Sequence, residues 1–324
     1  MSSKFLITGA SGCIGSWVQR VLLDRGIDFI ATDLEINTAR TRLLLTKEEL
    51  AGIEYASLDV TDTHAVADMV ATQNITHIVH LAGLQIPFAK ANPPLGAAVN
   101  VQGTVNIFEA ARNANVTGIA YASSAAVFGP ADRYPNDRIM DDAPRLPETL
   151  YGVYKTADED IARIYWQDWQ IGSVGLRPAV VFGVGRDQGL TSDISKAILA
   201  AAANEAFEIR FSGLITLQLA KDVAAIFIEA ALCNHQGSIT CNLRNDVIEV
   251  SDFVNLLHDV KPNSKVSYLK NMPLPFPADY DDSNLQSILS ASVPHTPLRD
   301  AISENLDHYS RLLPDQNLLD QLTS

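Results

Sequence analysis

The sequence predicts an α/β protein, with a doubly wound parallel sheet and a smaller C-terminal α/β lobe. An apolar stretch near the N-terminus breaks into glycines and then into a helical pattern, which is typical of a strand, a turn and a helix. Strands and helices then alternate, and this alternation indicates a parallel sheet with helices on both faces. The 324 residues are 47% hydrophobic, which is enough to build a sizeable core.

The first strand, turn and helix are predicted over residues 4–16. Gly9 permits the tight turn, Gly12 lets the backbone approach a pyrophosphate, and Gly15 lets the helix pack close to the strand. The free N–H groups at the start of the helix would face the phosphates. We therefore expect a Rossmann dinucleotide-binding unit, and its turn also brings to the cofactor Ser11, Cys13 and Ile14.

The second predicted strand, residues 28–33, ends in an acidic side chain. Asp33 lies roughly twenty residues past the glycines, where a carboxylate accepts hydrogen bonds from an adenosine ribose. Because it would repel a 2′-phosphate, Asp33 favours NAD over NADP. The alternative is a solvated turn aspartate. Arg40 and Arg42 would suit a 2′-phosphate, but they lie well beyond the strand end.

A third strand is predicted over residues 53–60, followed by a helix over 63–73. Asp59 either caps this helix or holds the adenine amino group, and Val60 follows it along the cofactor. The next strand, residues 78–83, contains a histidine that we interpret as a core residue, His80. The end of this strand is expected to lie against the cofactor through Leu81, Ala82 and Gly83.

The chain is expected to divide into an NAD-binding domain, residues 1–178, and a mainly substrate-binding lobe, residues 179–324. The helix–strand segment 222–243 is expected to return to the main sheet. The other expected elements are a helix near 100–115, a strand over 118–124, a loop over 129–148, a helix opening near Tyr151, a strand over 173–177, a polar loop over 183–189, a helix near 193–204 and a strand near 208–211.

Tyr151 and Lys155 lie four residues apart and therefore share one face of the helix that they open. Ser123 and Ser124 end a strand upstream, and such strand ends point into the ligand crevice. A tyrosine hydroxyl can act as a base once its pKa of about 10 falls to roughly 7, which takes about 4 kcal/mol. A nearby ammonium and an oxidised nicotinamide would supply this. The alternative is a pair of surface residues on an ordinary helix.

Several motifs together resemble the extended short-chain dehydrogenases/reductases of the epimerase/dehydratase type. They follow the family order and cover most of the chain: Thr8–Gly15, His80–Gly83, Asn100–Thr104, Ser123–Gly129, Tyr151–Lys155 and Leu176–Gly183. The resemblance implies that Tyr151 is the acid/base and that Lys155 binds the nicotinamide ribose and lowers the tyrosine pKa. It also implies that Ser124, with Ser123 nearby, orients the substrate hydroxyl, and that Asn100 supports the cofactor backbone.

The resemblance further implies a homodimer that is joined through two helices of each subunit. The helix after Tyr151 carries side chains that would supply this face or, equally, pack in the core: Ile161, Ile164, Tyr165 and Trp169.

Two departures from the family pattern narrow the reaction. The sugar dehydratases carry acids where this chain has Ala125 and Ala126, so we expect neither a dehydratase nor a decarboxylase. The arginine that meets the diphosphate of a nucleotide sugar is replaced by an apolar residue near Ile215. A diphosphate without a guanidinium partner would be costly to bury, so the substrate is expected to lack a nucleotide.

The expected substrate is a small carbohydrate, sugar acid or hydroxy acid. Arg186 is the candidate for holding it, and the alternative for Arg186 is an ion pair with Asp187 in its own loop. The other residues expected to touch the substrate are Gln85, Ser124, Ala125, Gln188 and Thr191.

These observations predict an NAD-dependent oxidoreductase that oxidises a substrate hydroxyl. The alternatives are an NAD-dependent epimerase acting on a sugar or nucleotide sugar, and a dinucleotide-sensing protein without catalysis. The net charge of −14 argues against a nucleic-acid or membrane partner, and the three cysteines and seven histidines form neither a disulfide framework nor a metal site. The first strand begins near residue 4, so we expect no signal peptide and a cytoplasmic protein.

Overall fold

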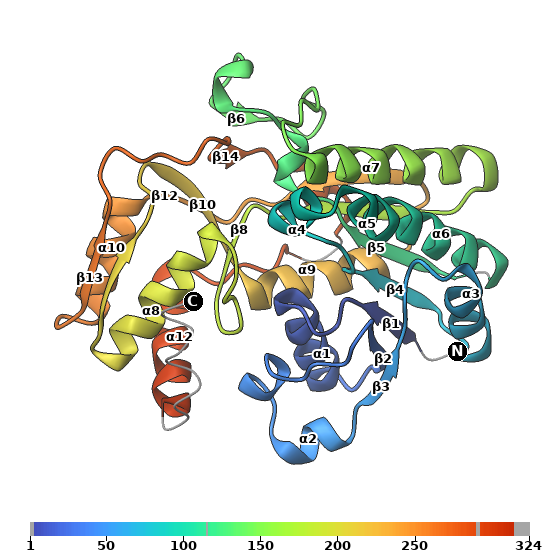
Figure 1. The fold of residues 1–324 in the computed structure, drawn as a ribbon, viewed down its shortest axis with the longest axis horizontal. Coiled ribbons are helices and arrows are strands. Elements are labelled where there is room, and N and C mark those ends of the chain that lie inside the picture. Colours follow the sequence, from blue (N-terminus) through green and yellow to red (C-terminus); the bar gives the residue numbers. More distant parts are fainter. Residues whose placement is uncertain (1–2, 115, 290–291, 314–324) are drawn as a thin grey trace.

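A seven-stranded parallel sheet forms the centre of the molecule (Figure 1). The computed structural model describes residues 3–114, 116–289 and 292–313. The strand order is β11-β7-β5-β4-β1-β2-β3, and every neighbouring pair is parallel. The strands are β1 (Lys4–Thr8), β2 (Asp28–Asp33), β3 (Glu54–Ser57), β4 (His77–His80), β5 (Gly118–Ala122), β7 (Ser173–Arg177) and β11 (Ser238–Asn242).

Helices cover both faces of this sheet (Figure 1). Along β1, Phe5 and Ile7 belong to one hydrophobic cluster and Leu6 to a second, because successive side chains of a strand point to opposite faces. The first cluster includes α1 (Cys13–Asp24) and α9 (Ala220–Leu232). The second includes α3 (Thr63–Thr72), α6 (Gly103–Ala114) and α7 (Leu150–Trp169). The predicted fold class is therefore confirmed.

Smaller sheets and further helices form the other side of the molecule (Figure 1). One sheet has the order β12-β10-β8, and two more are the pairs β13-β9 and β14-β6. Their strands are β6 (Arg138–Ile139), β8 (Val180–Phe182), β9 (Ala206–Ile209), β10 (Leu214–Leu219), β12 (Asp246–Glu249), β13 (Lys265–Tyr268) and β14 (Asp279–Tyr280). The helices on that side are α8 (Asp193–Ala203), α10 (Val250–Val260) and α12 (Leu298–Leu312). The helices α2 (Lys47–Ala51), α4 (Ile86–Ala91) and α5 (Pro93–Ala97) lie beside the seven-stranded sheet, and α11 (Ser283–Ile288) contacts its edge strand β11.

The segment 222–243 contributes α9 and the edge strand β11, which pairs with β7 from Ser238↔Ser173 to Asn242↔Arg177. The division near residue 178 stays a prediction. Several elements differ from expectation. The strand expected over 78–83 is β4, which ends at His80, the strand expected near 208–211 is β9, which ends at Ile209, and the loop expected over 129–148 contains β6. The third strand ends at Ser57, and the Leu58 nitrogen makes one further bond to the Asp33 carbonyl oxygen at 2.8 Å. The helix expected from residue 100 begins instead as a π-helical turn, Ala98–Gln102.

A buried ion pair joins α7 to the sheet. The Arg177 guanidinium, at the end of β7, bonds both oxygens of the Glu159 carboxylate, at 2.7 and 2.8 Å. Each side chain is only 3% exposed. Arg177 also donates to the Asp141 carbonyl oxygen at 2.8 Å and to the Asn242 side chain at 3.2 Å. A single side chain thus holds β7, α7, β11 and the loop before α7.

We expect Arg177→Ala to lower the free energy of unfolding by about 3–5 kcal/mol, because it leaves the Glu159 charge buried without its main partner. The measurement is equilibrium urea unfolding of the purified protein. Arg163→Ala is the matched control, since Arg163 is 52% exposed and only 3.5 Å from Asp160 on the surface of the same helix. A loss no larger than that of the control would contradict the importance of this pair.

Candidate functional site

The glycine turn after β1 has the shape that a dinucleotide requires. Gly9 has a φ of +69°, and a Cβ there would lie 2.7 Å from the Ala82 nitrogen. A Cβ on Gly15 would overlap the Gly9 carbonyl oxygen. Helix α1 begins at Cys13, and its cap residue Gly12 has no side chain to bond the first N–H groups. These groups are therefore free to bind an anion.

Asp33 is held at the mouth of this turn. One carboxylate oxygen accepts a hydrogen bond from the Ser11 nitrogen at 3.0 Å, and the other accepts one from the Leu34 nitrogen at 2.9 Å. The carboxylate therefore lies beside the glycine turn, where an adenosine ribose would approach. Asp33 is half-exposed as well as bound to the turn, so its role toward an adenosine ribose stays a prediction and the alternative of a solvated turn aspartate stays open.

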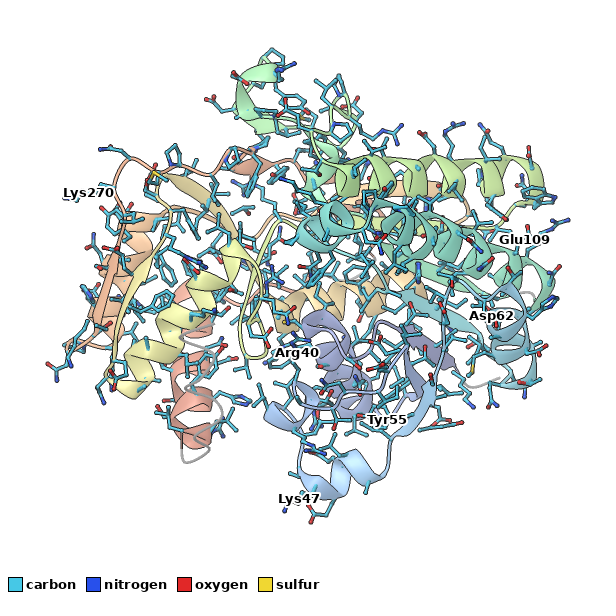
Figure 2. All side chains as sticks on the ribbon, in the orientation of Figure 1. Arg40, Lys47, Tyr55, Asp62, Glu109 and Lys270 are labelled. Atoms are coloured by element: carbon cyan, nitrogen blue, oxygen red, sulfur yellow. The ribbon has the colours of Figure 1, made fainter. Side chains whose placement is uncertain are left out.

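Asp59 does not cap the following helix. The Asp62 carboxylate caps α3 by accepting from the His64 and Ala65 nitrogens, both at 3.0 Å (Figure 2 labels Asp62). Asp59 instead accepts from the Thr61 nitrogen at 2.9 Å. The helix-capping alternative for Asp59 is therefore wrong, and contact with adenine stays a prediction. The Val60 side chain is buried against Gly103, and its carbonyl oxygen accepts from the Asn106 amide at 2.8 Å.

The end of β4 and the π-helical turn form the other half of the crevice. The Leu81 nitrogen bonds the Thr8 carbonyl oxygen at 3.1 Å, which holds the chain beside the glycine turn. The Asn100 amide donates to the Gly96 carbonyl oxygen at 2.8 Å, but its buried Oδ1 has no hydrogen-bond partner among the described residues. A Cβ on Gly83 would lie 2.8 Å from this oxygen and 3.6 Å from Lys155 Nζ. Gly83 therefore keeps open a space onto which both polar groups face.

Tyr151 and Lys155 lie in the first turns of α7. The Thr149 hydroxyl caps the helix by accepting from the Gly152 nitrogen at 3.0 Å. Lys155 Nζ lies 5.9 Å from the centre of the Tyr151 ring, and the lysine side chain is 3% exposed. Burial lowers the pKa of Lys155, but the charges of Asp158 and Tyr151 outweigh it, and the net shift is upward.

The two serines at the end of β5 have different surroundings. Ser124 starts a short 3₁₀ turn, and its hydroxyl accepts from the Ala126 nitrogen at 3.1 Å. A Cβ on Gly152 would overlap the Ala126 carbonyl oxygen, so this glycine lets α7 pack against the serine turn. The Ser123 hydroxyl donates to the Glu159 carboxylate at 2.5 Å and is 2% exposed, which leaves it bound to the buried ion pair.

His80 lies beneath the crevice as a core residue, as predicted. Its Nδ1 lies 2.7 Å from the Thr8 hydroxyl, and its Nε2 lies 3.3 Å from the Thr104 hydroxyl. Burial, with a further contribution from the Lys155 charge, lowers the pKa of His80 to about 3. The ring is therefore neutral and cannot act as an acid at neutral pH.

The predicted substrate residues are only partly brought together. Arg186 Nη2 donates to the Thr191 hydroxyl at 3.3 Å, and the buried Arg186 Nε has no partner among the described residues. Gln188 is exposed, and Gln85 is exposed at the start of α4. Ala125 is 7% exposed and packs in a small hydrophobic cluster, which leaves little of its side chain for a substrate.

Asp187 does not pair with Arg186, and that alternative is wrong. The partner of Asp187 is Arg40, whose Nη2 lies 2.7 Å from the carboxylate (Figure 2 labels Arg40). The same guanidinium donates to the Ser11 carbonyl oxygen at 3.0 Å. Arg40 thus joins the glycine turn to the loop that carries Arg186. Burial raises the pKa of Cys13 in this turn to about 11, although the charges of Arg186 and Arg40 oppose the shift.

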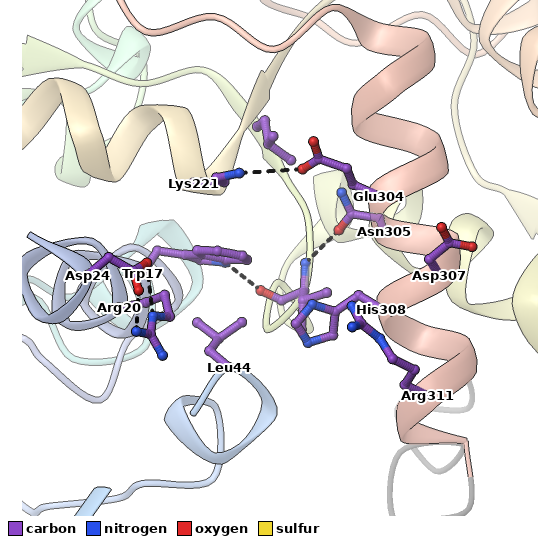
Figure 3. A pocket seen from close by; sticks show the side chains of 12 residues that line it. Trp17, Arg20, Asp24, Leu44, Lys221, Glu304, Asn305, Asp307, His308 and Arg311 are labelled. Carbon is purple, nitrogen blue, oxygen red and sulfur yellow. Dashed lines mark hydrogen bonds and ion pairs between the residues drawn. The ribbon is translucent and has the colours of Figure 1, made fainter. Parts of the chain in front are cut away.

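A separate cavity of about 400 Å³ lies behind this loop (Figure 3). The Trp17 indole donates to the Val184 carbonyl oxygen at 2.9 Å, and Asn305 accepts from the Val184 nitrogen at 3.0 Å. The cavity contains none of the residues predicted to bind NAD or the substrate. Its charged groups are largely paired, as Lys221 with Glu304 at 3.5 Å and Arg20 with Asp24.

Comparison with known proteins identifies the family. Residues 5–237 match the model of the NAD-dependent epimerase/dehydratase family. The chain belongs to this family. The resemblance inferred from the motifs is therefore confirmed, as is NAD as the cofactor of the family. The glycine cradle, the unpartnered Asn100 Oδ1 and the space beside Gly83 fit that cofactor.

Several members of this family are similar over a large part of the chain. A UDP-glucose 4-epimerase of Mycolicibacterium smegmatis is 30% identical over 210 residues, which are 63% of this chain and 66% of that protein. UDP-glucuronate 4-epimerase 4 of Arabidopsis thaliana is 30% identical over 220 residues, which are 65% of this chain and 49% of that protein. The match thus spans about half to two thirds of these relatives.

Solved structures share the fold over nearly the whole chain. A partial-consensus L-threonine 3-dehydrogenase has a TM-score of 0.81 at 20% identity and covers 95% of this chain and 99% of its own. MoeE5 in complex with UDP-glucose and NAD has a TM-score of 0.77 at 24% identity and covers 96% of this chain and 100% of its own. At these identities the likeness extends to the fold alone.

The part of the chain described here contains no group of three or more His, Cys, Asp and Glu side chains that is placed to hold a metal ion. Its helices are all too short or too polar to cross a membrane.

The sequence pattern indicates neither Asp158 nor Glu159, and it suggests Arg40 only for a 2′-phosphate. Arg40 lies beyond the end of β2, yet the intervening loop folds back to the glycine turn, where Arg40 bonds the Ser11 carbonyl oxygen and Asp187. The two acids follow Lys155 by three and four residues, a spacing that places them near it on the same helix but does not show that they are buried.

We expect Gly83→Ala to weaken NAD binding by at least about tenfold, because its methyl group would occupy the space between Asn100 Oδ1 and Lys155 Nζ. The measurement is titration of the purified protein with NAD by calorimetry. Gly52→Ala is the control, since a Cβ there would meet its nearest neighbour at an ordinary 3.5 Å. Equal affinity in the two variants would show that the cofactor does not use this space.

Proposed function

We propose that the protein is an NAD-dependent oxidoreductase that oxidises a hydroxyl group of a small non-nucleotide carbohydrate, sugar acid or hydroxy acid. The observation that carries this proposal is the placement of Tyr151 and Lys155 in the first turns of α7, packed against the Ser124 turn at the end of β5. The glycine turn and the Gly83 space open at the same edge of the sheet, where the carboxyl ends of parallel strands meet.

The chain would hold the cofactor from two sides. The glycine turn and Asp33 suit the adenosine and pyrophosphate half, while Asn100 Oδ1 and Lys155 Nζ suit the nicotinamide half. When bound, NAD supplies the acceptor for the hydride that leaves the substrate carbon.

Tyr151 is proposed to take the proton of the substrate hydroxyl. Lys155 Nζ lies 5.9 Å from the centre of the Tyr151 ring, so its positive charge would stabilise the negative charge that develops as the proton is transferred. Ser124 would hold the substrate oxygen, because its hydroxyl already accepts from Ala126 and retains its own proton to donate. Ser123 is less suited, since its proton is engaged with Glu159.

The environment of residue 215 supports a substrate without a nucleotide. Ile215 is 2% exposed on β10 and pairs with Ile248, so this position faces the core rather than a ligand. Arg186 supports a substrate with an anionic or hydroxyl-rich group, since its buried Nε has no partner among the described residues and would donate to such a group.

A second candidate is an NAD-dependent epimerase, which the names of the similar UDP-sugar 4-epimerases favour. In that reaction Tyr151 would remove and then return the proton, and the keto intermediate would turn within the site. Mixing the purified protein with NAD and a panel of sugars, sugar acids and hydroxy acids separates the two. Stoichiometric NADH supports the dehydrogenase, whereas NAD retained through purification with no NADH formed supports the epimerase.

The proposal also includes a homodimer. Ile164 and Trp169 on α7 are 38% and 40% exposed, which suits a contact between subunits. Tyr165 serves the core instead, where its ring packs on Phe108 at 5.1 Å, and Ile161 packs against the same cluster. Sedimentation of the purified protein measures the oligomeric state directly.

Tyr151→Phe is expected to lower kcat by about 10²- to 10⁴-fold, because the variant keeps the ring and loses the proton-transfer group. NAD affinity should change little. Tyr154→Phe is the control on the same helix, since that hydroxyl bonds the Pro93 carbonyl oxygen at 3.0 Å. Substantial turnover in Tyr151→Phe would rule out the proposed base.

Arg186→Ala is expected to lower kcat/KM by about 10- to 100-fold on the true substrate, through loss of a charged hydrogen bond. Arg133→Ala, at a side chain that is 61% exposed, is the control. An unchanged kcat/KM would remove Arg186 from the substrate site, and a weakened NAD affinity instead would assign it to the cofactor.

A further inference from the structure

Asp158 is a buried carboxylate whose position the fold alone does not explain. Its side chain is 0% exposed, and its Oδ2 lies 3.0 Å from Lys155 Nζ. Its Oδ1 makes no hydrogen bond with any described residue. Burying a carboxylate with one unsatisfied oxygen costs free energy. We therefore infer that Lys155, the group that Asp158 contacts, requires this carboxylate.

The neighbouring acid on the same helix shows what a structural carboxylate looks like here. Glu159 is also buried, but it accepts hydrogen bonds from Arg177, Arg145 and Ser123, and so joins several elements. Asp158 has one ionic partner, and that partner is Lys155. Asp158 therefore serves the lysine rather than the packing of α7.

Lys155 requires a counter-ion because it is buried. An ammonium group without one can lose its proton near neutral pH, since burial disfavours the charged form. Among the described residues, the Asp158 carboxylate is the one hydrogen-bond partner of Nζ. Tyr151, Lys155 and Asp158 follow the spacing i, i+4, i+7, which places all three on one face of the helix.

The other titratable or charged groups near this pair do not replace Asp158 as the counter-ion of Lys155. His80 on β4 is neutral, and Tyr121 on β5 has its pKa raised well above the usual value, by burial first. Arg177 on β7 is bound to Glu159. On α6, the Thr104 hydroxyl helps to hold down the pKa of Asp158, but it is uncharged and donates to the Asn100 carbonyl oxygen at 2.7 Å, so it cannot serve as the counter-ion of Lys155.

We propose that Asp158 is a positioning residue: its carboxylate keeps the buried Lys155 ammonium protonated and directed toward the nicotinamide side of the crevice. This rests on the proposed function, in which Lys155 must be charged to assist Tyr151. Burial raises the pKa of Asp158 to about 6, against the opposing charge of Lys155. The carboxyl is therefore about half ionised near pH 6. The ion pair forms as the pH rises above this value, and below it the carboxyl becomes neutral while the lysine stays charged.

The test is the ionisation of Lys155 itself, followed by NMR in protein labelled at the lysine ε-carbon. Its resonance is assigned as the one that is absent in Lys155→Met. In the parent protein we expect Lys155 to stay protonated beyond the usual lysine range, as its raised pKa requires. In Asp158→Asn, which keeps the shape and loses the charge, we expect its midpoint to fall by about one to three pH units.

Asp160→Asn is the matched control. It removes one carboxylate two residues along the same helix, where the side chain is 43% exposed and pairs with Arg145. The Lys155 midpoint should not move in this variant. Asp158→Ala provides the same measurement if Asp158→Asn does not fold. An unchanged Lys155 midpoint in the folded Asp158 variant would overturn the proposal.

Once a substrate is known, the pH dependence of kcat gives a second measurement. Loss of a residue with only a structural role would not change the shape of this dependence. Asp158→Asn should lose kcat as the pH rises above the lowered Lys155 midpoint, in a range where the parent retains it. A uniform loss at every pH would overturn the proposal. The two proposals can fail independently. Full activity in Tyr151→Phe would rule out Tyr151 as the base, whereas the titration midpoint of Lys155 is measured by NMR without any substrate.

Discussion

The buried pair of Arg177 and Glu159 is the constraint on which the geometry of this molecule depends. Removing both charges from water is expensive, and the cost is offset because nearly every donor of the guanidinium has a partner. The pair lies one turn beyond Lys155 and fixes how α7 rotates against the sheet. Lys155 and Tyr151 thus face the crevice because Arg177, on β7, holds their helix in position.

Three consecutive acids on α7 show how differently neighbouring charges can be used. Asp158 meets Lys155, Glu159 meets Arg177, and Asp160 meets Arg145 near the surface. Successive helix residues point about 100° apart. The side chains of these three consecutive acids therefore point to the active crevice, to the core and to the solvent. Only the last of the three acts as an ordinary exposed charge.

Much of the fold was predictable because it depends on local pattern. The strands of β1, β2 and β7 and the helix of α3 follow from apolar spacing and turn residues within a few positions. The tyrosine, the lysine and the glycine turn were also predictable, since each motif is short. Contacts between distant residues were not. Arg40 and Asp187 are 147 positions apart, and no local signal pairs them. The use of Asp158 depends on burial, which a run of three acids does not suggest.

The bond between Trp17 and the loop before α8 has a spectroscopic consequence. The chain has three tryptophans, and the other two, Trp166 and Trp169, lie together near the end of α7. Trp17 alone reaches across to the Val184 carbonyl oxygen, in the loop that Arg40 connects to the glycine turn. A protein with Trp166 and Trp169 replaced by phenylalanine would therefore carry a native fluorophore whose emission reports on that loop, without any attached dye.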